Sequence, residues 1–204
     1  MGSVIPLKKE IDNSYLRLKN LVGSKLDDVS QLIKYKLASE INLIHKMTDY
    51  HVKSGGKRIR PLLTLASAKL SGYKDGNRDI NLAACIELIH NATLLHDDVI
   101  DNSELRRGIK TANSVWGNQS SILVGDYLFS RCFEMMVEDG SQEILKLLSS
   151  TSARIAQGEV LQLEHKGDID LLEETYFNII NMKTAALFAA ATRVGACLGN
   201  KSKK

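Results

Sequence analysis

Apolar residues recur at helical spacing along almost the whole chain of 204 residues. The predicted helices cover residues 7–22, 26–53, 61–71, 80–103, 111–137, 142–165 and 170–199. Short breaks rich in Gly, Ser and Asp separate them. Pro61 suits a first helical turn and Gly72 the exit of the same helix. No segment shows the period-2 alternation of a half-buried strand, so the pattern predicts an all-α bundle, organised as one domain over residues 1–204.

The segment NLAACIELIHNATLLHDDVID (81–101) is apolar on most sides, which is typical of a buried helix. Its polar exceptions share about one third of the helix circumference. They are Glu87, His90, Asn91, Asp97, Asp98 and Asp101. Like charges so close together raise one another's pKa unless a cation is shared. The hard oxygen ligands suit Mg²⁺ together with phosphate, so the stripe predicts a metal and phosphate site.

A second charged element supports this interpretation. SGGKRIRP places Lys57, Arg58 and Arg60 after a glycine pair and before a helix start, where free backbone N–H groups attract anions. Taken singly, the aspartates could form a solvated helix end paired with Arg106 and Arg107, and SGGKRIRP could be a solvated basic loop. Together, one carboxylate cluster and two basic clusters predict a cleft that holds two diphosphates.

Composition narrows the class of protein further. Hydrophobic residues make up 44% and charged residues 25%, as in soluble globular proteins. The net charge of +3 is too small to imply a nucleic-acid partner. Cys85, Cys132 and Cys197 are far apart among apolar neighbours, which predicts reduced thiols and a cytoplasmic location. No export signal or spanning stretch is evident, so we expect membrane contact to be peripheral at most.

The motifs together resemble a known family. GGKRIRP followed by LLHDDVIDNSELRRG resembles the paired signature of trans-isoprenyl diphosphate synthases, with DDxxD as the first aspartate-rich motif. GNQSSILVGDYLFSRCFEMM, AQGEVLQLEHKGD and MKTAALFAAA resemble stretches of the long-chain bacterial members, especially octaprenyl diphosphate synthases. The resemblance implies an isoprenoid-synthase-type helical bundle with a central cleft. It also implies a homodimer that condenses isopentenyl diphosphate head to tail onto an allylic diphosphate, for isoprenoid and quinone side-chain biosynthesis.

The resemblance also implies residue roles. Asp97 and Asp101, helped by Asp98, would hold Mg²⁺ on the allylic diphosphate, which Arg106 would contact. The residues implied to bind isopentenyl diphosphate are Lys57, Arg60, His90 and Arg107, and Arg58 is included in the expected substrate-binding set. Lys183 and Thr184 match the family's Lys-Thr pair, which flanks the allylic diphosphate and helps to hold the reacting carbon.

Product length in the family depends on positions one or two turns before the carboxylates. Ala92 and Thr93 occupy them here and are small, which implies a tunnel open to a long product. The alternative is that Ala92 merely packs against a neighbouring helix.

Other polar and large residues are expected to be structural. Trp116, Cys85, Cys132, Met135 and Met136 are predicted to pack in the core or a dimer interface. We expect His45, His51 and His165 at the surface, and Asp126 at the dimer contact. His96 could support Asp97 or serve as a structural histidine.

One family element does not occur in these 204 residues, namely a second DDxxD-like motif beyond Lys183 and Thr184. We expect its absence to affect catalysis more than binding. Two hypotheses follow: a shortened long-chain synthase, or a catalytically silent homologue that acts as a dimer partner or is a relic. A terpene cyclase is a weaker third hypothesis, because it has no reason to keep GGKRIRP.

Overall fold

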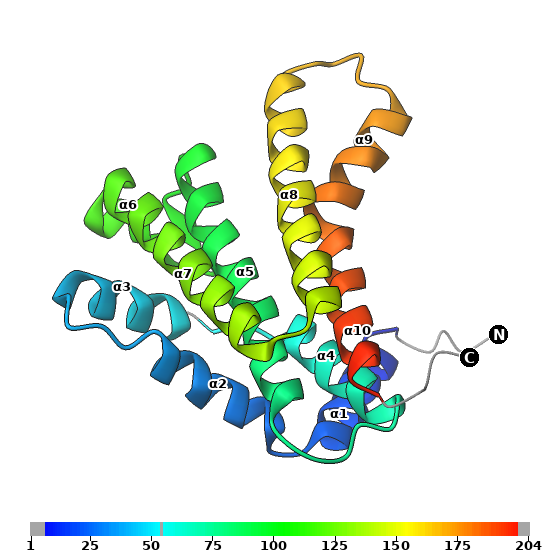
Figure 1. Cartoon of the computed structure of the whole chain (residues 1–204). Helices are drawn as coiled ribbons and strands as arrows, with labels where there is room; N and C mark the ends of the chain where they lie inside the picture. The colour runs from blue at the N-terminus through cyan, green and yellow to red at the C-terminus, as the bar shows by residue number, and fades with distance from the viewer. Residues whose placement is uncertain (1–6, 54, 200–204) are drawn as a thin grey trace.

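The computed structural model describes residues 7–53 and 55–199, which are almost entirely helical (Figure 1). The elements are α1 (Leu7–Val22), α2 (Lys25–Lys36), α3 (Asn42–Lys53), α4 (Ile59–Leu70), α5 (Arg78–Ile100), β1 (Leu105–Arg106), β2 (Ile109–Lys110), α6 (Ala112–Trp116), α7 (Asn118–Asp139), α8 (Gln142–Glu164), α9 (Glu173–Ile180), the π-helical turn η1 (Asn181–Ala185) and α10 (Ala186–Leu198). The predicted all-α class is confirmed. In the described ranges, no helix is long and apolar enough to cross a membrane.

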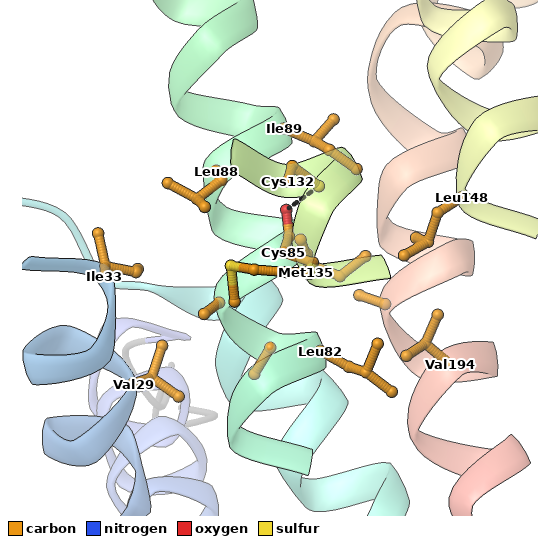
Figure 2. Packing of buried hydrophobic residues seen from close by; sticks show 14 of the residues in the cluster. Val29, Ile33, Leu82, Cys85, Leu88, Ile89, Cys132, Met135, Leu148 and Val194 are labelled. Carbon is orange, nitrogen blue, oxygen red and sulfur yellow. Dashed lines mark hydrogen bonds between the residues drawn. The ribbon is translucent and has the colours of Figure 1, made fainter. Parts of the chain in front are cut away.

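Helix α5 is the central element of the bundle. Every residue from Leu82 to Ile89 is buried, and the helix contacts α2, α4, α7 and α10. Figure 2 shows this packing, with Val29 and Ile33 of α2 on one side of α5 and Val194 of α10 on the other. The sequence predicted a helix buried on most sides, and the structure confirms it. Because neighbours surround α5, the polar residues along it have fixed positions.

The contact between α4 and α10 depends on a glycine in α10. A Cβ built on Gly195 would lie 2.2 Å from the carbonyl oxygen of Thr64 and 2.8 Å from the backbone nitrogen of Ala68. Both atoms belong to the backbone of α4, so they cannot move aside as a flexible side chain would. Gly195 therefore lets the two helices approach closely and brings α10 against the core.

A left-handed residue ends α5 just after the aspartates. Asn102 has φ of +50°, and its N–H bonds the carbonyl oxygen of Val99 at 3.2 Å. The N–H of Ser103 bonds the carbonyl oxygen of Asp98 at 2.9 Å, which completes a Schellman motif. Asn tolerates this backbone conformation better than most residues do. The chain therefore turns sharply after Asp101.

A two-residue antiparallel hairpin follows, which corrects the expectation that no strand occurs. Arg106 pairs with Ile109, and the connecting residues Arg107 and Gly108 have φ of +55° and +82°. Positive φ at both central residues is the geometry of a type I′ turn. Strands of two residues are too short to show an alternating pattern, which is why the sequence did not reveal them.

Two helices predicted as continuous are broken. The predicted helix over 26–53 divides into α2 and α3 after Leu37, whose side chain is buried, and α3 then packs against α6 and α7. The predicted helix over 111–137 breaks at Gly117, where φ is +86°. At that break Trp116 meets Tyr50 of α3 edge to face, with ring centroids 5.1 Å apart. In both cases tertiary packing outweighs helix propensity.

The last predicted helix, over 170–199, begins at Glu173 and contains a π turn, η1, between α9 and α10. It lies beside α8, which runs in the opposite direction (Figure 1). A π turn inserts one extra residue per turn and occurs most often at functional sites. Lys183 and Thr184 both lie in this turn.

We predict that Gly195→Ala destabilises the protein by about 1–2 kcal/mol. In an open helix this change would stabilise by up to about 1 kcal/mol, but here overpacking against the α4 backbone costs about 1–3 kcal/mol and sets the sign. Urea unfolding measures the difference. Ala196→Ser, at an exposed position on the same helix, is the control and should change stability by less than about 0.5 kcal/mol. A more stable Gly195→Ala variant would contradict the close contact.

Candidate functional site

A basic pocket of about 620 Å³ lies between the loop before α4, the middle of α5 and the hairpin turn. Its cationic and imidazole lining includes Lys57, Arg58, Arg60, His90, Arg106 and Arg107. The structure thus brings together, from three separate segments, the whole predicted substrate-binding set apart from Lys183 and Thr184. Anions with more than one charge suit such a pocket.

The loop before α4 has a backbone suited to binding anions. Gly55 has φ of +75°, and Arg58, a non-glycine residue, has φ of +46°. The hydroxyl of Tyr15 in α1 donates to the carbonyl oxygen of Lys57 at 2.9 Å, which ties the loop to the bundle. Helix α4 begins directly afterwards at Ile59, which itself lines the pocket. The free N–H groups at this helix start favour a bound anion.

The hairpin turn brings its arginines back onto the bundle. A Cβ on Gly56 would lie only 2.8 Å from Nη1 of Arg107, so the guanidinium lies close against the glycine loop. The preceding Arg106 binds Asp98 of α5 through its guanidinium, with Nη2 2.7 Å and Nε 2.9 Å from Oδ1. The hairpin therefore connects the two basic clusters of the sequence.

Two guanidinium nitrogens in the pocket are buried without a partner among the described residues. Nη1 of Arg58 and Nε of Arg60 have no hydrogen-bond acceptor within the described part of the chain. The Arg60 guanidinium also lies over the ring of Phe188 in α10, 4.2 Å from its centroid. A buried polar group without a partner costs about 1–3 kcal/mol, and a diphosphate oxygen would remove that cost.

Glu87 is the acidic residue among these cations. It is only 9% exposed, and burial raises the pKa of its carboxyl group, while Arg58, Arg60 and Arg107 act in the opposite direction. Burial likewise lowers the pKa of Arg60, and Glu87 partly offsets that effect. One carboxylate among these guanidiniums leaves the pocket positive.

Two histidines face the same pocket in the neutral form. The pKa of His90 falls to about 3, first because of burial and then because of Arg60. The pKa of His51 falls to about 4, again chiefly through burial. We expected His51 at the surface, but it lines the pocket, which corrects that prediction. The α2–α3 break explains the error, because it sets the direction of the helix that carries His51.

Asp97 and Asp101 lie at the other side of the site, near the C-terminal end of α5. The pKa of Asp97 rises to about 6, through burial, then through Glu159 of α8 and Asp101, while Lys183 and Arg106 lower it. The negative end of the helix dipole also disfavours anionic side chains here. A divalent cation would relieve this strain. Mg²⁺ usually binds one or two carboxylates and completes its shell with water and phosphate, so this pair fits it.

Asp98 differs from its neighbours in its partner, and its expected role in helping Asp97 and Asp101 stays a prediction. Its side chain is 2% exposed and both oxygens accept hydrogen bonds from Arg106. This pair connects the hairpin to α5, while Arg106 also lines the basic pocket. In the residues that the structure describes, no three His, Cys, Asp or Glu side chains form a ready metal cluster.

Lys183 and Thr184 reach the site from η1. The Lys183 ammonium donates to Oε2 of Glu159 at 2.7 Å, and Thr184 is exposed. Lys183 lies close enough to Asp97 to lower the pKa of that carboxyl group. The structure thus places the predicted Lys-Thr pair on the carboxylate side, away from the basic pocket.

The remaining predicted residues have mixed outcomes. Ala92 is fully buried in the core, and the hydroxyl of Thr93 donates to the carbonyl oxygen of His90 at 2.8 Å; their role in product length stays a prediction. Nε2 of His96 lies 3.2 Å from the carbonyl oxygen of Ile122. His96 therefore connects α5 to α7, as a structural histidine would.

A family model of the polyprenyl synthetases matches residues 41–204. The chain belongs to this family. It is 44% identical to an octaprenyl diphosphate synthase of Escherichia coli strain K12 over 182 residues, which cover 89% of this chain and 56% of the relative. It is 42% identical to an all-trans-nonaprenyl-diphosphate synthase of Rhodobacter capsulatus, over 85% of this chain and 53% of the relative.

Solved structures of this family agree with the fold. A polyprenyl synthase from Caulobacter crescentus, complexed with calcium and isoprenyl diphosphate, superposes with a TM-score of 0.88 at 45% identity. The match covers 91% of this chain and 56% of that one. The chain therefore spans about half the length of the curated polyprenyl synthetases that it matches.

The sequence interpretation missed Glu159 and Phe188 as members of this polyprenyl synthetase site. Glu159 follows Gly158 in the C-terminal third of α8. A glycine inside a helical pattern usually marks close packing, so Gly158 was a usable signal that a neighbouring segment contacts α8 here. Phe188 gave no such signal, because aromatic residues on helices are usually core residues.

We predict that His51 makes stability depend on pH. Its pKa is lower in the folded protein, about 4 against 6.5, so the unfolded chain binds more protons between these values. Stability is therefore full above pH 6.5 and falls as the pH drops toward 4, by at most about 1.4 kcal/mol per pH unit. The His51→Gln variant should lose this contribution in urea unfolding at pH 7, 6 and 5. His45→Gln, on the same helix but exposed, is the control. Parallel curves for wild type and His51→Gln would refute the prediction.

Proposed function

We propose that this chain acts in long-chain polyprenyl diphosphate synthesis, by condensing isopentenyl diphosphate head to tail onto an allylic diphosphate. The observation that carries the proposal is the basic pocket. Six predicted residues from three segments converge there, and two buried guanidinium nitrogens have no partner in the described residues. The carboxylates Asp97 and Asp101 lie further along α5, near its C-terminal end. A cationic pocket beside a carboxylate pair suits one diphosphate bound directly and a second bound through a metal.

The residues of the chain have distinct tasks in this proposal. Lys57, Arg60 and Arg107 bind the diphosphate of isopentenyl diphosphate, and neutral His90 can donate a hydrogen bond to it. Mg²⁺ on Asp97 and Asp101 would neutralise charge that develops on the allylic leaving group. Lys183 adds a positive charge on the same side. Ala92 and Thr93 leave room for a long product. We further propose that the protein is a homodimer.

Two measurements test the function: whether the protein elongates an allylic diphosphate, and whether one pocket variant loses affinity for isopentenyl diphosphate. Purified protein is incubated with Mg²⁺, farnesyl diphosphate and labelled isopentenyl diphosphate, and the extracted products are analysed. We expect elongated polyprenyl chains. Arg107→Ala should raise KM for isopentenyl diphosphate about 10-fold or more, as for loss of a hydrogen bond to a charged group. Arg17→Ala, at an exposed position in α1, is the matched control. Absence of any elongated product at high protein concentration would refute catalysis by this chain.

Substitutions of the neighbouring Asp97 and Asp98 should affect different properties, metal binding for Asp97 and stability for Asp98. Asp97→Asn should weaken Mn²⁺ binding, measured by electron paramagnetic resonance in place of Mg²⁺, at little cost in stability. Asp98→Asn leaves Arg106 facing a neutral partner, and breaking a buried ion pair costs about 3–5 kcal/mol. Since Arg106 is partly exposed, we expect about 2 kcal/mol in urea unfolding. Unchanged Mn²⁺ affinity in Asp97→Asn would contradict the metal assignment.

A further inference from the structure

The ammonium of Lys183 is held by a carboxylate from another helix. Its Nζ lies 2.7 Å from Oε2 of Glu159 in α8, and the two side chains are 23% and 17% exposed. A lysine side chain is flexible, and a fixed partner selects one of its conformations. Partial burial shields this pair from solvent, so it is more than a surface ion pair.

The backbones are brought together at the same point. A Cβ on Gly158 would lie 2.8 Å from the backbone nitrogen of Lys183 and 2.8 Å from Cβ of Met182. Only glycine therefore lets α8 approach η1 so closely. The adjacent Gly158 and Glu159 combine a close backbone contact with an ion pair, and together they fix where η1 presents Lys183.

Glu159 also lies within reach of the predicted metal ligands. It lines a second pocket, of about 370 Å³, together with Asp101. Its charge and that of Lys183 act on Asp97 in opposite directions. Its other oxygen, Oε1, is buried and has no hydrogen-bond partner among the described residues. The Glu159–Lys183 pair therefore lies on the carboxylate side of the site, beside Asp101.

We propose that Glu159 is a positioning residue: it holds Lys183 beside Asp97 and Asp101 so that the ammonium meets an allylic diphosphate already oriented. Glu159 also offers Lys183 a partner other than Asp97. Asp97 is a carboxylate whose pKa Lys183 already lowers, so without Glu159 the ammonium would be free to pair with a proposed metal ligand. This inference rests on the proposed function, because it assigns Lys183 to the allylic diphosphate.

A double-mutant cycle tests the proposal. The variants are Glu159→Ala, Glu159→Gln, Lys183→Ala and Glu159→Ala with Lys183→Ala. Glu164→Gln, at an exposed position on the same helix, is the matched control. Isothermal titration with Mg²⁺ present gives the affinity for a non-hydrolysable farnesyl thiolodiphosphate and, separately, for isopentenyl diphosphate. Circular dichroism melting establishes that each variant is folded.

We expect Glu159→Ala to weaken the allylic analogue about 10-fold, as for loss of a residue that orients a ligand-binding group. The affinity for isopentenyl diphosphate should stay within about 2-fold, because the basic pocket is untouched. Glu159→Gln keeps a hydrogen-bond acceptor for Lys183 and should recover most of the loss. The double variant should bind no more weakly than Lys183→Ala alone, since Glu159 acts through Lys183.

The outcomes separate this inference from the proposed function. Losses that multiply in the double variant, or equal losses for both diphosphates, would overturn the positioning role while leaving the function intact. If Glu159→Ala does not fold, Glu159→Leu takes its place, because leucine fills a similar volume but accepts no hydrogen bond from Lys183. A loss of about 10-fold confined to the allylic analogue supports the positioning role, and no selective loss overturns it. A wild-type protein that binds neither diphosphate would overturn both proposals.

Discussion

The ion pair between Asp98 and Arg106 determines how the charged motifs are arranged. Asp98 is buried near the C-terminal end of α5, and the guanidinium of Arg106 binds it from the hairpin that follows. This contact folds the chain back after α5 and directs Arg107 toward the glycine loop. It also divides the DDxxD motif, because the middle aspartate is used internally while Asp97 and Asp101 keep their oxygens for other partners. Carboxylates that look alike in the sequence therefore have different surroundings in the structure.

Uncompensated charge occurs both in the basic pocket and on the carboxylate side of the site. In the basic pocket, two buried guanidinium nitrogens have no acceptor among the described residues, and on the carboxylate side the pKa of Asp97 is raised. Each side alone destabilises the fold, because buried polar groups without partners cost free energy. A diphosphate and a divalent cation have the opposite charges. The ligand pair of the proposed function would therefore stabilise both sides.

Two close helix contacts at glycines, outside the pocket itself, determine where the site residues lie. Gly195 brings α10 against α4, and Gly158 brings α8 against η1. The first contact places Phe188 under Arg60, and the second places Lys183 beside Glu159. The positions of Arg60 and Lys183, which contact substrate in the proposed mechanism, therefore depend on close helix packing at two glycines. Substitutions far from the chemistry would shift it through these contacts.

Much of the fold and some of the site could be predicted from the sequence, because periodicity shows which residues share a helix face. The buried α5 and its polar stripe were predicted in this way. The basic clusters at Lys57 and Arg106 were recognised instead from the charged residues beside glycines in the sequence. The breaks after Leu37 and at Gly117, the two-residue hairpin and the inward position of His51 were not, since each depends on packing against distant segments. Likewise, only the tertiary structure shows that Asp98 pairs with Arg106 rather than with Arg107, and that Lys183 pairs with Glu159. Sequence spacing describes neighbours on one helix, whereas ion pairs between helices depend on how those helices pack.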